Sequence, residues 1–263
     1  MRDAAALFLF VGGFLASVLT EFLCGRGSER CKIDWSPLYG NEAVYYGGHC
    51  GRGDKDAGLG DPGLSVSSLF LIIPLVYWAP SDGALYTPPV SAFLGVASFL
   101  FHAANTEASA TLDFIGLNLL GPALVADFVA DGGRPKTAVA GFLVLLAATV
   151  AVRVGVDDDF PRTQDVFNTY TYVTQSIMAA ILLVLFWRRD LVAAWLPATI
   201  IVGGCVSLIV ANNSSRFWAC INTQLAEPHF WGHLLVAVGA TLYCRALHSA
   251  TEETPMRGRY KRV

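Results

Sequence analysis

Charged residues are scarce in this chain. They make up 15% of its 263 residues, whereas hydrophobic residues make up 54%; a soluble domain carries roughly 25% charged residues. The mean hydropathy is +0.50, and the net charge of −3 argues against a nucleic-acid partner. Internal repeats and low-complexity tracts are lacking as well. The composition therefore predicts a polytopic membrane protein that forms one compact bundle without a separate soluble domain.

Eight apolar runs divide the sequence. The first, at residues 4–23, is either a cleaved signal peptide or a retained anchor helix. The others lie near residues 66–80, 88–104, 110–130, 137–154, 166–187, 190–211 and 229–247. The run at 66–80 is short for a span of about 20 residues, so we expect it to extend backwards to Leu59 or to kink at Pro74. The pattern predicts an all-α bundle of seven core transmembrane helices, preceded by an N-terminal helix or signal peptide.

This division gives four parts. Residues 1–23 form the N-terminal segment, 24–65 a polar glycine-rich loop, 66–250 the seven-helix core and 251–263 a basic tail. Threading the runs across a bilayer collects the basic loops and the basic tail on one face, with Arg2, Arg134, Lys136, Arg188, Arg189, Arg257, Arg259, Lys261 and Arg262. By the positive-inside rule, we expect the C-terminus to be cytosolic and the long loop to face a lumen or the cell exterior.

Five polar side chains interrupt the apolar runs on the face of the long loop. Ser98 and His102 are four residues apart and share one helix face, and Asp113 stands at the start of the next run. His229 and His233, again four apart, begin the last run. Ionisable groups are costly inside a membrane, so each is a functional candidate.

Three histidines suit a catalytic zinc site, in which three protein ligands leave the fourth position to water. Two histidines four apart on a helix offer two ligands from one face. Zinc lowers the pKa of its bound water to about 7, and Asp113 could accept a proton from that water or orient a ligand histidine. Ser98 could hydrogen-bond a substrate carbonyl or Asp113. The alternative is that these histidines and Ser98 are hydrogen-bonded packing residues of the bundle.

The combined pattern resembles the CREST superfamily of membrane hydrolases and, within it, the alkaline ceramidases. The family's elements are Ser-x-x-x-His, an Asp eleven residues after that His, and a distant His-x-x-x-His, which match Ser98–His102, Asp113 and His229–His233. SFLFH is similar to the family's Ser-x-x-Phe-His, PHFWGHLL to its His-Ala-Trp-Trp-His-Ile-Leu, and SSLFLIIP at 67–74 to the start of its first core helix. The resemblance covers about residues 34–250.

The resemblance implies a zinc-dependent ceramidase. His102, His229 and His233 would bind Zn²⁺, Asp113 would activate the water, and Ser98 would assist at the amide carbonyl. The substrate would be ceramide within the membrane, cleaved to a sphingoid base and a fatty acid. Such a protein would lie in the endoplasmic reticulum or Golgi membrane, with its active site in the lumen.

The resemblance also implies a calcium site in the long loop, built in the family from an Asp-Trp-x-Glu-x-Asn segment and a later acid. Pro37 and Tyr39 stand where the family has Glu and Asn, so we expect weaker Ca²⁺ dependence than in the family. The candidate ligands are Asp34, Trp35, Asn41, Glu42 and Asp61.

A disulfide is expected on the same face, because a lumenal or extracellular compartment is oxidising. Cys220 matches one of the family's paired cysteines, whereas Ser36 replaces the other. The resemblance therefore leaves Cys31 or Cys50 as the partner of Cys220.

Other functional classes compete with the ceramidase hypothesis. A hydrolase that remodels the lipid of GPI anchors would use a similar constellation. Progestin and adiponectin receptors share the superfamily's zinc residues but have the opposite orientation, against which the basic tail argues. A structural scaffold would have no use for an Asp and three His in register.

Overall fold

The computed structural model describes residues 2–23, 62–77, 84–104, 106–131, 133–156, 162–189 and 228–260, together with positions 197, 200, 201 and 204. Seven α-helices and one 3-10 helix make up this part of the chain, which confirms the all-α prediction for it. They are α1 (Arg2–Leu23), α3 (Pro62–Ser68), η2 (Leu69–Tyr77), α4 (Thr87–Ala104), α5 (Glu107–Asp131), α6 (Pro135–Gly155), α7 (Arg162–Arg189) and α10 (Pro228–Tyr260). Of the predicted run at 190–211, the four described positions are helical.

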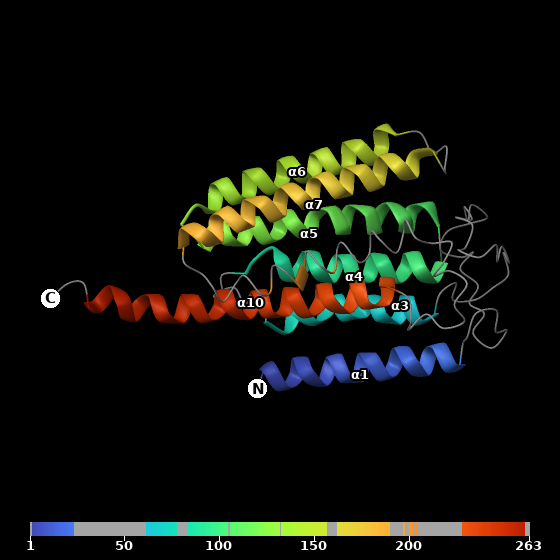
Figure 1. Cartoon of the computed structure of the whole chain (residues 1–263), viewed down its shortest axis with the longest axis horizontal. Coiled ribbons are helices and arrows are strands. Elements are labelled where there is room, and N and C mark those ends of the chain that lie inside the picture. Colours follow the sequence, from blue (N-terminus) through green and yellow to red (C-terminus); the bar gives the residue numbers. More distant parts are fainter. Residues whose placement is uncertain are drawn as a thin grey trace.

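The helices run side by side along one axis (Figure 1). α4 packs against α5 and against the α3–η2 segment, α5 also contacts α6 and α7, and α1 and α10 both pack on α3 and η2. α4 ends at the same end of the bundle at which α3, α5 and α10 begin, on the right in Figure 1. This threading brings residues from distant parts of the sequence to one end of the bundle. α10 continues as a helix past the predicted span, into the segment predicted to be a tail.

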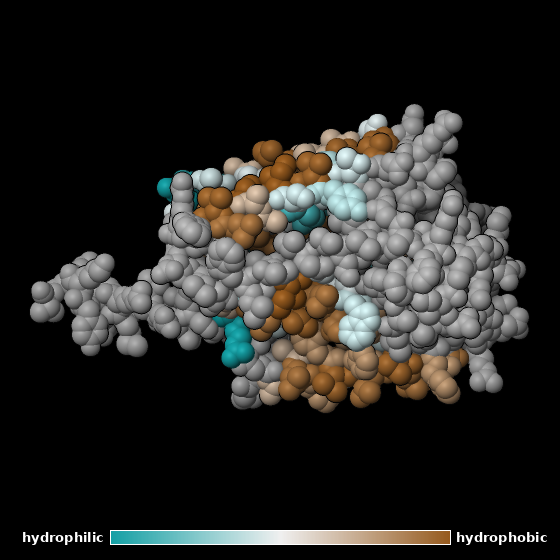
Figure 2. All heavy atoms as spheres, viewed as in Figure 1, coloured by the Kyte–Doolittle hydropathy of each residue, from teal (hydrophilic) through white to brown (hydrophobic). Residues whose placement is uncertain are grey.

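Among the residues that the structure describes, three helices are long and apolar enough to cross a membrane, over Ala108–Asp131, Pro135–Gly155 and His229–Leu247. Shorter apolar helices cover Ala4–Thr20, Ser65–Leu75, Thr87–Ala103 and Thr169–Leu185. Figure 2 shows apolar surface along the outer edges of the bundle, over α1 and over α6 and α7. Such a surface suits an integral membrane protein, in which lipid chains cover the outside of the bundle. The full set of seven core spans stays a prediction.

The described part of the short run at 66–80, which ends at Tyr77, is built from two kinds of helix. The described segment extends backwards to Pro62, as α3, and at Leu69 the backbone changes to the 3-10 helix η2, which contains Pro74. Proline has no backbone N–H, and its ring crowds the carbonyl group four residues earlier, so a regular α-helix is disfavoured there. The change of helix type directly follows Ser67 and Ser68, which end α3.

Local sequence signals account for several helix starts. α3, α6 and α10 begin at Pro62, Pro135 and Pro228; proline suits the first turn because its missing N–H would have no intrahelical partner. α5 begins after Thr106, whose hydroxyl accepts from the Ser109 backbone N–H at 3.1 Å, while the Thr106 N–H donates to the Ser109 hydroxyl at 3.0 Å. This reciprocal cap fixes the start of the helix that carries Asp113.

A buried carboxylate joins α4 to α5. Asp127, on α5, accepts hydrogen bonds from the backbone N–H groups of Leu85, Tyr86 and Thr87 at 2.6, 2.8 and 2.8 Å. These groups lie at the N-terminus of α4, where backbone N–H groups lack intrahelical partners and the helix dipole favours a negative charge. Asp127 therefore fixes how far α4 is shifted along α5.

Candidate metal centre

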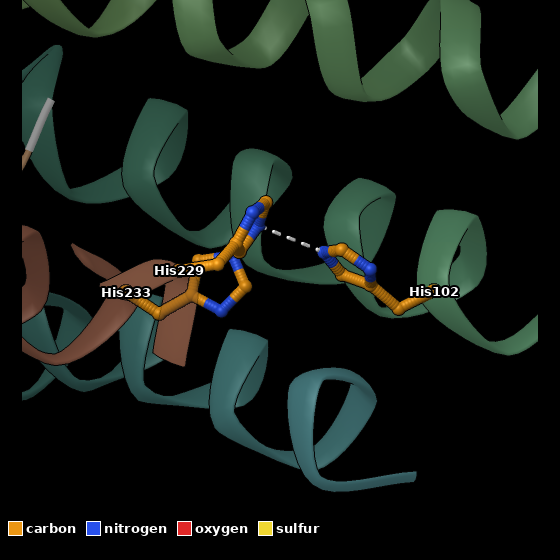
Figure 3. A group of neighbouring side chains, drawn as sticks. All are labelled: His102, His229 and His233. Atoms are coloured by element: carbon orange, nitrogen blue, oxygen red, sulfur yellow. Dashed lines mark hydrogen bonds between the residues drawn. The ribbon is translucent and has the colours of Figure 1, made fainter. Parts of the chain in front are cut away.

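Two helices bring three histidines together at one end of the bundle. His102 stands in the last turn of α4, and His229 and His233 stand in the first two turns of α10. One candidate ligand atom from each of the three lies within 4.8 Å of the others. In Figure 3 the three rings converge on one region between α4 and α10. Within the described residues, this is the group of His, Cys, Asp or Glu side chains that could hold a metal ion.

The spacing of two of the histidine nitrogens is close to that of a tetrahedral zinc site. The Nε2 atoms of His102 and His229 are 3.1 Å apart, and two nitrogens bound to tetrahedral zinc at about 2.0–2.1 Å lie about 3.3 Å from each other. His102 and His233 are buried, with 7% and 2% of their surface exposed, whereas His229 is half-buried. Three imidazoles in this arrangement leave a fourth coordination position for water or substrate.

Ser98 connects this cluster to a carboxylate. Its hydroxyl oxygen lies 3.3 Å from Nε2 of His233, and a side-chain hydrogen bond joins Ser98 to Asp113 in the second turn of α5. Ser98 is one turn before His102 on α4, so both face α10 from the same helix. The structure thus places together all five residues predicted for the zinc and catalytic set: Ser98, His102, Asp113, His229 and His233.

Two further serines reach the cluster from α3. Ser67 Oγ lies 3.0 Å from Nδ1 of His233, and Ser68 Oγ lies 3.5 Å from the same nitrogen. The Ser68 hydroxyl donates to that of Ser98 at 3.2 Å. Both serines are fully buried. In the sequence they mark only the start of an apolar run, and small polar residues are common where membrane helices touch, so their contact with His233 was not predicted.

α4 packs closely against both α3 and α5, and this short separation allows the contacts of the serine side chains. A Cβ atom added at Gly95 would lie 3.0 Å from the Ser68 carbonyl oxygen, and one at Gly116 would lie 3.0 Å from the Leu94 Cα. Small residues let membrane helices pack at short separation. Gly95 and Gly116 therefore bring α3 and α5 near enough to α4 for Ser98 to interact with Ser68 on one side and with Asp113 on the other.

The donor set fits zinc chemistry. Three neutral imidazoles are ligands that zinc accepts, and the carboxylate and hydroxyl beside them match the groups that assist hydrolysis in such sites. A bound zinc ion would supply Lewis acidity and an acidified water. The geometry thus supports a metal site at the end of an apolar helix bundle.

The remaining predicted site residues lie outside the described part of the chain. They are the calcium candidates Asp34, Trp35, Asn41, Glu42 and Asp61, and the disulfide candidates Cys31, Cys50 and Cys220. Cys244 is described, as a free thiol buried in α10.

Comparison of the chain with protein-family models, with curated proteins and with solved structures found no match.

Proposed function

We propose that this protein is a zinc-dependent membrane amidohydrolase that cleaves ceramide to a sphingoid base and a fatty acid. The observation that carries the proposal is the convergence of His102, His229 and His233, next to the Ser98–Asp113 pair, at one end of an apolar bundle. The resemblance of the same residues to the alkaline ceramidases supports the choice of substrate.

The location of the cluster suits a lipid whose reacting bond lies near the headgroups. Ceramide carries its amide there, and its two hydrocarbon chains can stay among apolar helices. The outer faces of α1, α6 and α7 expose large apolar side chains, including Phe8, Val144 and Val173, so substrate can reach the protein from within the bilayer.

In the proposed reaction Asp113 transfers the proton and Ser98 stabilises the developing negative charge. Asp113 accepts a proton from the attacking water as the water oxygen bonds to the amide carbon. It returns the proton to the amide nitrogen as the carbon–nitrogen bond breaks, so that a carboxylic acid and an amine leave. Ser98 donates a hydrogen bond to the carbonyl oxygen, on which negative charge develops.

Product analysis tests the proposal. Purified protein, given ceramides, phytoceramides and glycerophospholipids in mixed micelles, should release fatty acid and sphingoid base from one of the first two classes. Asp113→Asn protein serves as the control for contaminating hydrolases. Release of fatty acid from glycerophospholipid esters alone would contradict the ceramide assignment and favour a lipid-remodelling hydrolase. No hydrolysis of any lipid by protein that holds zinc would favour a receptor.

A further inference from the structure

The contact between Ser67 and His233 has a chemical consequence for metal binding. Neutral imidazole carries one N–H and one lone pair, and the lone pair is the metal ligand. Histidines that bind metals usually donate their other ring N–H to an oxygen, and this hydrogen bond selects the tautomer. Ser67 Oγ lies 3.0 Å from Nδ1 of His233, which leaves Nε2 as the nitrogen for a metal.

A second tautomer of His233 competes with this one. Ser98 Oγ lies 3.3 Å from Nε2, so an Nε2–H group could donate to it. In that tautomer the lone pair would be on Nδ1, facing α3 and away from the metal. The hydrogen bonds around the ring therefore decide whether His233 can bind an ion.

Ser67 is better placed than Ser68 to select the tautomer of His233. Its oxygen is 0.5 Å nearer to Nδ1, by the difference between 3.5 and 3.0 Å, and the Ser68 hydroxyl donates instead to Ser98. Ser67 is fully buried, so water has little access to replace its oxygen if the hydroxyl is removed.

We propose that Ser67 is a positioning residue that accepts the Nδ1–H of His233 and so turns the Nε2 lone pair toward the metal. This inference rests on the metal site of the proposed function but does not depend on which lipid is cleaved. Ser67 does not touch the reacting atoms; it acts through His233.

Zinc affinity of the purified full-length protein, measured by competition with a chromogenic chelator, tests the inference. Ser67→Ala should weaken zinc binding by about 10–100-fold, as loss of such supporting hydrogen bonds does in other metal sites. Ser91→Ala, a matched change at a buried serine of α4 that donates to the Leu71 carbonyl oxygen outside the cluster, should bind zinc nearly as tightly as the unmodified protein. Ser67→Thr keeps the hydroxyl and should restore most of the affinity.

A second readout follows the tautomer itself. In metal-free protein with ¹⁵N-labelled histidine, NMR should show the Nδ1–H form of His233 in the unmodified protein and a shift toward the Nε2–H form in Ser67→Ala. Cobalt-substituted protein should show a change in its visible absorption in Ser67→Ala and no change in Ser91→Ala.

The outcomes separate this inference from the proposed function. Unchanged zinc affinity in Ser67→Ala, with zinc lost in His233→Ala, would overturn the inference and leave the hydrolase proposal standing. Equal weakening in Ser67→Ala and Ser91→Ala would overturn it too, because a general disturbance of the packing of α4 on the α3–η2 segment would then explain both. Zinc binding that depends on Ser67 in a protein that cleaves no ceramide would support the inference and contradict the proposed substrate.

Discussion

The Ser98 hydroxyl lies where three polar groups meet. Nε2 of His233 is 3.3 Å away, the Ser68 hydroxyl donates to it at 3.2 Å, and Asp113 shares a side-chain hydrogen bond with it. A hydroxyl has one proton to donate. When a metal occupies the Nε2 lone pair, the Ser98 proton is available only for Asp113 or for a substrate oxygen. The residue therefore links the metal ligands to the carboxylate.

Substitutions of the carboxylate and of the hydroxyl should have different effects on turnover. Asp113→Asn should retain zinc and lower turnover by about 10²–10⁴-fold, because it removes the group that carries the proton. Ser98→Ala removes one hydrogen bond, worth about 0.5–1.5 kcal/mol, and should lower turnover by no more than about tenfold.

Metal content and steady-state ceramide hydrolysis, measured on the same preparations, check both expectations. Wild-type turnover in Asp113→Asn would contradict the assigned base. Zinc loss in Asp113→Asn would mean that the carboxylate supports the metal site instead.

The sequence predicted the polar residues at this site better than the residues that support them. Histidines are rare in apolar helices and are therefore easily recognised. Their positions, together with the alternating direction of successive helices, were enough to predict that His102 lies near His229 and His233. Serine in an apolar helix carries little signal, so Ser67 was missed. Asp127 was missed for another reason. Its carboxylate accepts hydrogen bonds from the N-terminus of a helix that begins 40 residues earlier in the sequence, and only the packing of α4 on α5 shows that α4 is this helix.

At the scale of elements, the α4–α5 pair is joined near both ends. Asp127 binds the first N–H groups of α4, and Ser98 on α4 meets Asp113 on α5 near the other end. The tyrosine hydroxyl of Tyr243 also donates to the Leu124 carbonyl at 2.8 Å, which ties α10 to α5. The three helices that carry the candidate site are thus held in a fixed register. That register could not be derived from hydropathy, which defines the spans but not their relative shifts.

Loss of the Asp127 charge should destabilise the bundle. Asp127→Asn keeps the shape, but the amide nitrogen cannot accept, so at least one of the three hydrogen bonds from backbone N–H groups is lost and the others no longer involve a charge. We expect a loss of about 1–3 kcal/mol in the free energy of unfolding. Thermal unfolding in detergent or nanodiscs measures this loss. Asp131→Asn, one turn further along α5 and half-buried, is the matched control and should have the smaller effect. Equal melting temperatures for Asp127→Asn and the unmodified protein would show that the contact contributes nothing.

Close packing at Gly95 gives a second prediction at this scale. In Gly95→Ala the new methyl group would meet the Ser68 carbonyl oxygen at 3.0 Å and Leu71 Cβ at 3.1 Å, so α4 must move away from α3. We expect a loss of about 1–3 kcal/mol, typical of overpacking, and weaker zinc binding.

Gly141→Ala is the control for helix propensity. A Cβ there meets nothing within 4 Å, so this change should leave stability unchanged or raise it by up to about 1 kcal/mol. Equal effects of the two substitutions on the melting temperature would contradict the packing argument.

At the scale of the whole molecule, the candidate site and the C-terminal end of α10 lie at opposite ends of the structure (Figure 1). α10 carries the histidines in its first turns and the basic residues Arg257 and Arg259 in its last. By the positive-inside rule, we expect that basic end to face the cytosol. The proposed hydrolase would then act on the lumenal or outer leaflet.

Tag accessibility checks the orientation. A tag after Val263 should react with antibody in selectively permeabilised cells, in which internal membranes stay sealed. A tag within residues 50–58 should react only after those membranes are opened. The reverse pattern would place the histidines on the cytosolic side and favour a receptor-like protein.

The most direct measurement of the central claim is ceramide hydrolysis by purified protein before and after removal and return of zinc. We predict about one zinc per chain, from the three-ligand site, loss of fatty-acid release on chelation, and recovery when one equivalent of zinc is restored. His233→Ala protein should bind little zinc and show no recovery. Undiminished ceramide hydrolysis by the metal-free protein, or by His233→Ala, would contradict the account.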